Sequence, residues 1–439
     1  MRYSAIWRTR DRVVKKMRIC FISRRFFPAI SGMSVYALNL LHELVAAKHD
    51  VVMISQYRDD AAGAAVYGGG PPPPVPGVNV IGLASVGEQQ VAFGQPANFE
   101  EDIDAMVAAA VREHAKAPFD IIHAQYAYPN GMAALILSRR LGIPCVVSIQ
   151  GGDGHWVGAC CRTHALAMQA VLSFADALLI GSASFAREVG EKHGTALSRL
   201  TVLPGATDTA AFTPLSEKPP GSLATVPVVL YHGRVDRRKG VMETIDAVAQ
   251  LVHAGRALRF IISGIGPDLG AAKARANEKG ISDVTEFTGY TSYENAPAIY
   301  WRGDIFVSPT YAEGFSNTIL EAMASGLPII STRVVGVVDC LSDRVNSLLV
   351  EPKEVAALAT ALTEVLDDAP LRNRLATAAL REVREHYAWG PIGRRIIGVY
   401  EACLGKAPDP GWMSIYDPNV ATYANADLSC RFRAAPHLL

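Results

Sequence analysis

Two carboxylates follow an apolar strand closely enough to act on one ligand. The stretch EGFSNTILE places Glu313 and Glu321 with seven residues between them. The run DIFVSP before it predicts a strand, and Ser316 or Asn317 is a good N-cap for the helix that follows. Glu313 then lies on the loop, and Glu321 lies about one turn into the helix. Because open parallel sheets bind ligands at the carboxyl ends of their strands, both carboxylates can face one crevice.

The start of this helix offers a site for an anion. Free backbone amides near Asn317 and Thr318 supply positive potential that suits a phosphate. A carboxylate accepts hydrogen bonds from paired hydroxyl groups. Two carboxylates beside an anion site therefore suit a sugar nucleotide, with one for the ribose and one for the attached sugar. A pair of Glu residues taken alone is more often solvated surface, so the neighbouring motifs decide between the two interpretations.

Two cations form the second candidate element. The segment HGRVDRRKG (232–240) directly follows an apolar strand and lacks the GxxxxGK[ST] order of an ATP-type phosphate loop. Arg234 and Lys239 flank a tight turn that opens onto a helix, where both can reach a diphosphate. Each charge-assisted contact is worth ~1.5 to 3 kcal/mol. The alternative is an exposed charge run shared with Arg237 and Arg238, but the position at a strand end favours a binding role.

The elements that must position these residues repeat one pattern. Short, nearly continuous apolar strands alternate with helical spacing over 17–213 and again over 228–390. Strands of this kind indicate parallel sheets covered on both faces. With 439 residues, of which 50% are hydrophobic, the chain is too long for one ordinary domain. We predict an α/β protein with two Rossmann-like, doubly wound domains that face a central cleft.

Four regions depart from this pattern. Residues 1–16 are basic but lack the apolar run of a secretory signal, and we interpret them as a tail. A weak contact with anionic lipid and an upstream start before Met17 are the alternatives. Residues 56–95, which include GGGPPPPVPG and one candidate strand, VNVIGL, predict a flexible excursion. The four prolines of 214–227 mark a linker, and 406–439 has no clear periodicity and predicts an irregular tail.

Composition excludes several classes of protein. Lys plus Arg and Asp plus Glu both number 42, so no overall field attracts nucleic acid. The seven cysteines form no CxxC pair and are odd in number, which indicates neither a disulfide framework nor a zinc site. We therefore expect no bound metal and a reducing, cytoplasmic location. No apolar run is long enough to cross a bilayer, so any membrane contact would be peripheral, at the inner face.

The order of several short blocks resembles a known family. GRVDRRKG, ISGIGPD, FTGY and SPTYAEGFSNTILEAMASGLPII are similar to the consecutive signature blocks of the retaining glycosyltransferases of family 4, the glycosyl transferases group 1, which have the GT-B fold. FPAISGMSVYALNLLHEL, DIIHAQY and SIQGGD resemble the looser blocks of that family's amino-terminal half. The resemblance covers roughly residues 17 to 405, apart from the Pro-rich excursion.

The resemblance implies sugar transfer from a nucleotide diphosphate sugar, with retention of configuration, to a glycan, a lipid-linked or a small-molecule acceptor. No cofactor is required. Arg234 and Lys239 would hold the diphosphate and, with Glu313, form the catalytic set, while Glu321 would bind the ribose. A helix at 391–405 would cross back onto the first domain, which would contain the acceptor site. The remaining predicted donor-binding residues are Gly32, Gly266, Gly289, Tyr290, Gly314, Phe315, Ser316, Asn317 and Thr318.

The acceptor side departs from the family pattern. Where the family commonly has His-Gly-x-Asp, this chain has Gln150 followed by two glycines and Asp153. A neutral amide thus replaces the imidazole, although it can still donate a hydrogen bond. Asp153, His155 and His123 are the candidates for the acceptor side, and His123 is equally well explained as a satisfied core residue.

Two other functions remain open at this stage. One is another GT-B activity, such as a sugar-nucleotide epimerase or a phosphorylase, which grips the same diphosphate. The other is a catalytically silent subunit that only binds nucleotide sugar. The segment DID (102–104) mimics an acidic metal motif, but it lies in a helical run and is better explained as a surface helix.

Overall fold

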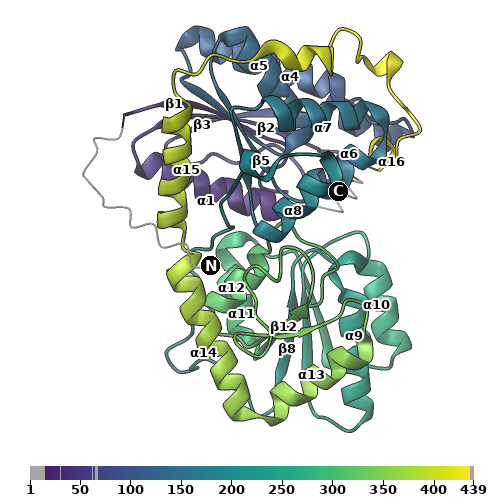
Figure 1. Ribbon diagram of the computed structural model, residues 1–439. Coiled ribbons are helices and arrows are strands. Elements are labelled where there is room, and N and C mark those ends of the chain that lie inside the picture. Colours follow the sequence, from purple (N-terminus) through teal and green to yellow (C-terminus); the bar gives the residue numbers. More distant parts are fainter. Residues whose placement is uncertain (1–14, 30, 62, 65–67, 436–439) are drawn as a thin grey trace.

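Two parallel sheets, one in each half of the chain, form two domains stacked end to end (Figure 1). This computed structural model describes residues 15–29, 31–61, 63–64 and 68–435. Most of the basic segment 1–16 lies outside the described residues. The fold is the predicted GT-B arrangement of two Rossmann-like domains.

The first sheet has seven parallel strands in the order β3-β2-β1-β4-β5-β6-β7. Its central strands are apolar and buried on both faces, which is why their sequences do not alternate. The strands are β1 (Arg18–Ser23), β2 (Asp50–Tyr57), β3 (Val78–Ala84), β4 (Ile121–Gln125), β5 (Cys145–Ile149), β6 (Ala177–Ile180) and β7 (Leu200–Val202).

Helices cover both faces of this sheet. Helix α1 begins after Ser31, whose side chain accepts a hydrogen bond from the backbone N–H of Ser34 (3.2 Å). It packs with a helix from the end of the chain on one face, and α4, α5 and α7 pack on the other. The helices are α1 (Gly32–Ala46), α3 (Val86–Gln89), α4 (Phe99–Lys116), α5 (Met132–Leu141), α6 (Gly158–Cys160), α7 (Arg162–Phe174) and α8 (Ala183–His193).

The second sheet has six parallel strands in the order β10-β9-β8-β11-β12-β13. The strands are β8 (Val228–His232), β9 (Arg259–Ser263), β10 (Thr285–Gly289), β11 (Ile305–Ser308), β12 (Ile329–Thr332) and β13 (Leu348–Val350). The helices are α9 (Val241–His253), α10 (Leu269–Glu278), α11 (Ala296–Arg302), α12 (Asn317–Ala324), α13 (Val355–Asp367) and α14 (Ala369–His386). The central strands β8 and β11 and their neighbours again form a buried apolar core.

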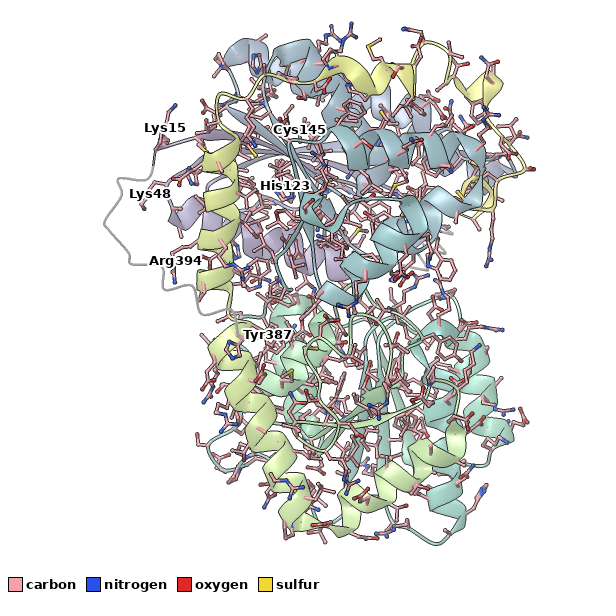
Figure 2. The ribbon with its side chains drawn as sticks, viewed as in Figure 1. Lys15, Lys48, His123, Cys145, Tyr387 and Arg394 are labelled. Atoms are coloured by element: carbon pink, nitrogen blue, oxygen red, sulfur yellow. The ribbon has the colours of Figure 1, made fainter. Side chains whose placement is uncertain are left out.

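The chain returns to the first domain at its end. Tyr387 lies where α14 gives way to α15 (Trp389–Cys403), at the junction of the two domains (Figure 2). Helix α15 then runs along the first domain beside α1 (Figure 1), where the ring of Trp389 lies 5.2 Å from that of Tyr36. The two domains are therefore joined by two crossings of the chain, which limits how far they can separate.

The candidate strand VNVIGL within the predicted excursion over 56–95 is confirmed as β3, so the prediction that the whole segment is flexible was wrong for its second half. Strand β3 pairs with β2 along the edge of the first sheet, and α3 follows it. Glu88 in α3 is buried and pairs with Arg24 (3.2 Å) and Arg25 (2.9 Å) beside β1. Burial opposes ionisation of Glu88, but these guanidinium groups outweigh it and hold its pKa at about 2. The pairing of Glu88 with Arg24 and Arg25 joins residues more than 60 positions apart, so no local pattern in the segment indicates it.

The segment after α15 is irregular in sequence and packs closely on the first domain. Trp412 is buried against α7, and the ring of Phe432 in α16 (Arg431–Ala434) stacks on Phe99 at 4.5 Å. The fully buried Arg433 pairs with Glu100 of α4, with Nη1 2.8 Å from Oε2. Among the described residues, no helix is both long and apolar enough to cross a membrane.

Candidate active site in the interdomain cleft

The loop between β11 and α12 places the two carboxylates as expected. Glu313 lies on the loop, where its backbone N–H donates to the carbonyl of Val335 (3.1 Å). Glu321 lies within α12, which begins at Asn317 with Ser316 in the N-cap position. The Ser316 side chain makes no capping hydrogen bond, so it does not occupy the first amides of this helix. Both carboxylates line one cavity of about 270 Å³, called here the second-domain cavity.

The two cations that line this cavity each pair with a carboxylate. Lys239 Nζ lies 2.7 Å from Glu313 Oε1, and Arg234 Nη2 lies 3.2 Å from Asp236 Oδ2. Burial opposes ionisation of Asp236, but a hydrogen bond from Arg238 and the charge of Arg234 hold its pKa at about 2. Asp236 therefore stays ionised and orients Arg234. It lies inside the quoted motif, yet sequence reasoning assigned it no role.

Glu321 is a buried acid. Its side chain is 3% exposed, and Oε2 accepts a hydrogen bond from the Tyr300 hydroxyl (2.7 Å). Burial raises its pKa to about 8, although the Tyr300 hydrogen bond acts in the opposite direction. Near neutral pH this carboxyl is mostly protonated before a ligand binds. Tyr300 comes from α11 and carries no motif signal, so only the packing of α11 against α12 reveals it.

Most of the predicted donor-binding residues gather around the second-domain cavity, including Gly32 from the first domain. The Asn317 side chain bridges the domains by donating from Nδ2 to the carbonyl oxygen of Gly32 (3.0 Å). The predicted residues that line this cavity are Gly32, Arg234, Lys239, Tyr290, Glu313, Phe315, Ser316, Asn317, Thr318 and Glu321.

Three of the predicted glycines lie outside the second-domain cavity. A Cβ on Gly266 would lie 2.2 Å from the carbonyl oxygen of Val235, so this glycine is needed for packing between two loops. Gly289 ends β10 beside Tyr290, with a φ of +71°. A Cβ on Gly314 would lie 2.4 Å from the Gln150 carbonyl oxygen, so Gly314 lets the two domains approach closely.

A second cavity, of about 340 Å³, extends from the same cations toward the first domain and is called here the first-domain cavity. It shares Gly32, Arg234, Lys239 and Glu313 with the second-domain cavity. Its other walls include Tyr36, Gln150, His155, Trp156, Arg238 and Gly314. The sequence indicated His155 and the Gln150 loop, but not Tyr36 or Trp156, because an aromatic residue in a helix or loop has no distinctive spacing.

His123 and Asp153 do not contribute to either cavity, and the structure corrects their predicted acceptor role. His123 is fully buried, with its ring nitrogens 2.5 Å from the Tyr400 hydroxyl and 2.7 Å from Ser148 Oγ. Figure 2 shows it well inside the first domain, near α15. Burial lowers its pKa to about 3, so it is a neutral core residue that ties β4 to α15.

Asp153 instead holds the loop after β5 in shape. It is fully buried and accepts backbone hydrogen bonds from Ala127 (2.7 Å), Gln150 (3.0 Å) and Gly151 (2.8 Å). Burial raises its pKa, and these N–H groups act against that shift. The same loop continues to His155, whose Nδ1 lies 2.8 Å from Glu188 Oε1. Asp153 is thus a positioning residue for the wall of the first-domain cavity.

Comparisons with known proteins agree with this geometry. The family model of the glycosyl transferases group 1 matches residues 215–382, and that of the glycosyl transferase 4-like domain matches residues 31–206. A glycogen synthase of Mycobacterium tuberculosis is 26% identical over 88% of this chain and 95% of its own length. A D-inositol 3-phosphate glycosyltransferase of Nocardia farcinica is 30% identical over 65% of this chain and 67% of its own length.

Solved structures show the same fold. Sucrose-phosphate synthase from Thermosynechococcus elongatus superposes with a TM-score of 0.72 at 23% identity, over 88% of this chain and 99% of that one. Anabaena HepE, solved in complex with UDP-glucose, gives a TM-score of 0.67 at 16% identity, over 88% of this chain and all of that one.

Two facing Rossmann-like domains, with cations and carboxylates that line a cavity where they meet, define the GT-B fold. The chain belongs to the glycosyl transferases group 1, the retaining glycosyltransferases of family 4. It is an enzyme that moves a sugar from a nucleotide diphosphate sugar to an acceptor.

Proposed function

We propose that the nucleotide sugar binds in the second-domain cavity, with its diphosphate between Arg234, Lys239 and the first amides of α12. The observation that carries this proposal is the convergence of two cations, a helix N-terminus and two carboxylates on one cavity. The buried Glu321 would accept hydrogen bonds from the ribose hydroxyls, and Tyr290 would lie beside the base. Glu313 would face the transferred sugar.

The proposed reaction needs no nucleophile from the protein. The bond between the sugar C1 and the phosphate oxygen breaks, and the acceptor oxygen bonds to C1 on the same face. Configuration is retained because departure and attack take place on the same face. The acceptor's hydroxyl proton passes to the departing phosphate oxygen, which balances the charge. The protein's part is electrostatic: Arg234 and Lys239 stabilise the negative charge that grows on the diphosphate, and the proposal requires neither a metal nor another cofactor.

The acceptor would occupy the first-domain cavity. Trp156 is 47% exposed and lines this cavity together with Tyr36, and the flat apolar faces of such rings suit the C–H faces of a sugar or cyclitol. Gln150 and His155 add hydrogen-bonding groups. A volume of about 340 Å³ supports a small polyhydroxylated acceptor, or the end of a glycan or lipid-linked sugar, rather than a long enclosed chain.

We propose a cytoplasmic setting. Seven thiols are free among the described residues, which suits a reducing compartment. Peripheral contact of the basic segment 1–16 with a membrane stays a prediction, because most of that segment lies outside the described residues.

Substitution of the two cations tests the proposal. A thermal-shift panel of UDP-, GDP- and ADP-sugars first identifies the donor, since a ligand of the folded state raises its apparent stability. With that donor and a panel of sugar and cyclitol acceptors, Arg234→Ala or Lys239→Ala should lower kcat by ~10- to 1,000-fold, which corresponds to ~1.4 to 4 kcal/mol of transition-state stabilisation.

Arg237→Ala is the matched control, because Arg237 lies in the same loop, pairs with Asp268 and has a side chain 67% exposed. It should change kcat by less than about threefold. Full activity in both the Arg234 and Lys239 variants would overturn the assigned roles. Conversion of the donor to an epimer without any acceptor would instead identify an epimerase.

A further inference from the structure

Four potential metal ligands meet in the first domain, and none of the four lines either cleft cavity. Cys160 and Cys161 lie at the junction of α6 and α7, His164 lies in the first turn of α7, and Cys430 precedes α16 near the end of the chain. One ligand atom from each residue lies within 4.8 Å of all the others. In particular, His164 Nδ1 lies 3.0 Å from Cys160 Sγ and 3.5 Å from Cys430 Sγ.

The local backbone explains why adjacent cysteines can share one ion. In a continuous helix, neighbouring side chains point in different directions. Here α6 ends at Cys160 and α7 begins at Arg162, so Cys161 is extended, with φ −166° and ψ 166°. This break brings both sulfurs to the same side as His164. Cys160 Sγ also donates to the Val157 carbonyl (2.7 Å), a hydrogen bond that ion binding would replace.

The ligand set and its spacing fit zinc. Three thiolates and one imidazole are a common structural zinc set, and with Zn–S bonds of about 2.3 Å, tetrahedral geometry puts sulfurs roughly 3.8 Å apart. Separations of up to 4.8 Å therefore need shifts of only about 1 Å to reach that geometry. Hard cations such as Mg²⁺ prefer oxygen ligands, and none of the four groups offers one.

The surroundings of His164 also favour a ligand role. Its ring is fully buried, with Nδ1 toward the sulfurs, and its centroid lies 4.7 Å from the ring centroid of Tyr128 and 5.3 Å from that of Phe432. Nε2 has no hydrogen-bond partner in the described part of the chain. When only one nitrogen of a buried imidazole has polar partners, a strong bond at that nitrogen stabilises the ring most.

We propose that Cys160, Cys161, His164 and Cys430 bind one Zn²⁺ ion as a closed, tetrahedral structural site. The three thiols lose their protons when the ion binds, and His164 stays neutral with its proton on Nε2. With four protein ligands, the ion has no open position for substrate, so its role is to hold structure.

The site connects two segments that lie far apart in the sequence. Cys430 belongs to the irregular end of the chain, which forms only short turns between Pro410 and α16. Cys160 lies three residues after Val157, the last residue of the turn that begins at Asp153 and carries Trp156 into the first-domain cavity. The ion would thus fix the chain end to the back of a wall of that cavity.

Metal analysis of the full chain tests this site without relying on enzyme activity. The chain is purified without a polyhistidine tag or reducing-agent carry-over, and bound metals are measured by inductively coupled plasma mass spectrometry. We expect about one zinc per chain in the wild type and in Cys340→Ser, a buried cysteine in the second domain that serves as control. Cys430→Ser and the double variant Cys160→Ser with Cys161→Ser should lose it.

A second measurement keeps the proposal falsifiable if these variants do not fold. Cobalt substituted into the wild-type chain should give the intense thiolate charge-transfer and ligand-field absorption of a tetrahedral sulfur-rich site, and a chelator should lower the Tm. Equal zinc content in the wild type and a folded Cys430→Ser variant would overturn the proposal. So would an intact mass that is two hydrogens lower without reductant, because a disulfide would then occupy two of the thiols.

Discussion

Replacing Glu321 with Gln should make the stability of the enzyme less sensitive to alkaline pH. The carboxyl has an ordinary pKa of 4.5, which burial in the cavity wall raises to about 8. Between these two values the folded state holds a proton that the unfolded state has released. The free energy of unfolding of the wild type therefore falls as pH rises through this window, and it stops falling above about pH 8. A Gln side chain has nearly the same shape and does not titrate.

The magnitude follows from the difference between the two pKa values. One pKa unit corresponds to about 1.4 kcal/mol, so the shift from 4.5 to about 8 sets an upper bound of roughly 5 kcal/mol at pH 9. Water penetration and local relaxation reduce such effects, and about 2 kcal/mol is a realistic expectation. For a domain of this size that corresponds to about 4 to 8 °C in Tm. The cost of burying the amide itself does not depend on pH and cancels in the comparison.

The assay compares the Tm of the variant and the wild type at pH 5 and at pH 9, followed by urea denaturation. The Tm of Glu321→Gln minus the Tm of the wild type should be several degrees larger at pH 9 than at pH 5. Glu278→Gln is the control, because Glu278 lies in the same domain with a side chain 63% exposed and should show no such dependence. An unchanged difference between the two pH values would refute the conclusion that Glu321 is buried as a neutral acid.

Two further predictions concern ligand linkage and the end of the chain. If the ribose hydroxyls donate to Glu321, nucleotide binding at pH 7 should release a proton, because the bound state favours the carboxylate. Calorimetry in two buffers of different ionisation enthalpy measures the proton release. Equal apparent binding enthalpies in the two buffers would contradict the prediction. Arg433→Ala should lower the free energy of unfolding by about 3 kcal/mol, because it leaves the mostly buried Glu100 carboxylate without its cation. Exposed Arg431→Ala is the control for urea denaturation, and an equal effect of both substitutions would show that the buried pair does not stabilise the fold.

Several features of this enzyme follow from short stretches of its sequence. Apolar strands of four to eight residues, alternating with helical spacing, are enough to indicate two parallel sheets. The loop from Glu313 to Asn317, with Glu321 in the next helix, is one contiguous segment, so its placement at a strand end follows from local rules. Arg234 and Lys239 were found in the same way.

Other features depend on contacts that no local pattern encodes. His123 and Asp153 have residue types that suit catalysis, but packing against Tyr400 and backbone N–H groups makes both of them buried structural residues. The sequence of β3 indicates a candidate strand, but only its pairing with β2 makes it the edge of the first sheet. Conversely, Tyr36 and Trp156 reach the first-domain cavity because separate elements converge there.

The cluster around His164 shows the same limit most clearly. Cys430 lies 266 residues from His164 along the chain, and no spacing rule connects residues so far apart. The sequence by itself determined the fold class, the family and the groups that we propose bind the donor, because hydrophobic periodicity and strand-end loops act over a few residues. The tertiary structure alone decided which polar side chains face solvent, which are buried and which meet, because burial and proximity arise only when the chain has folded.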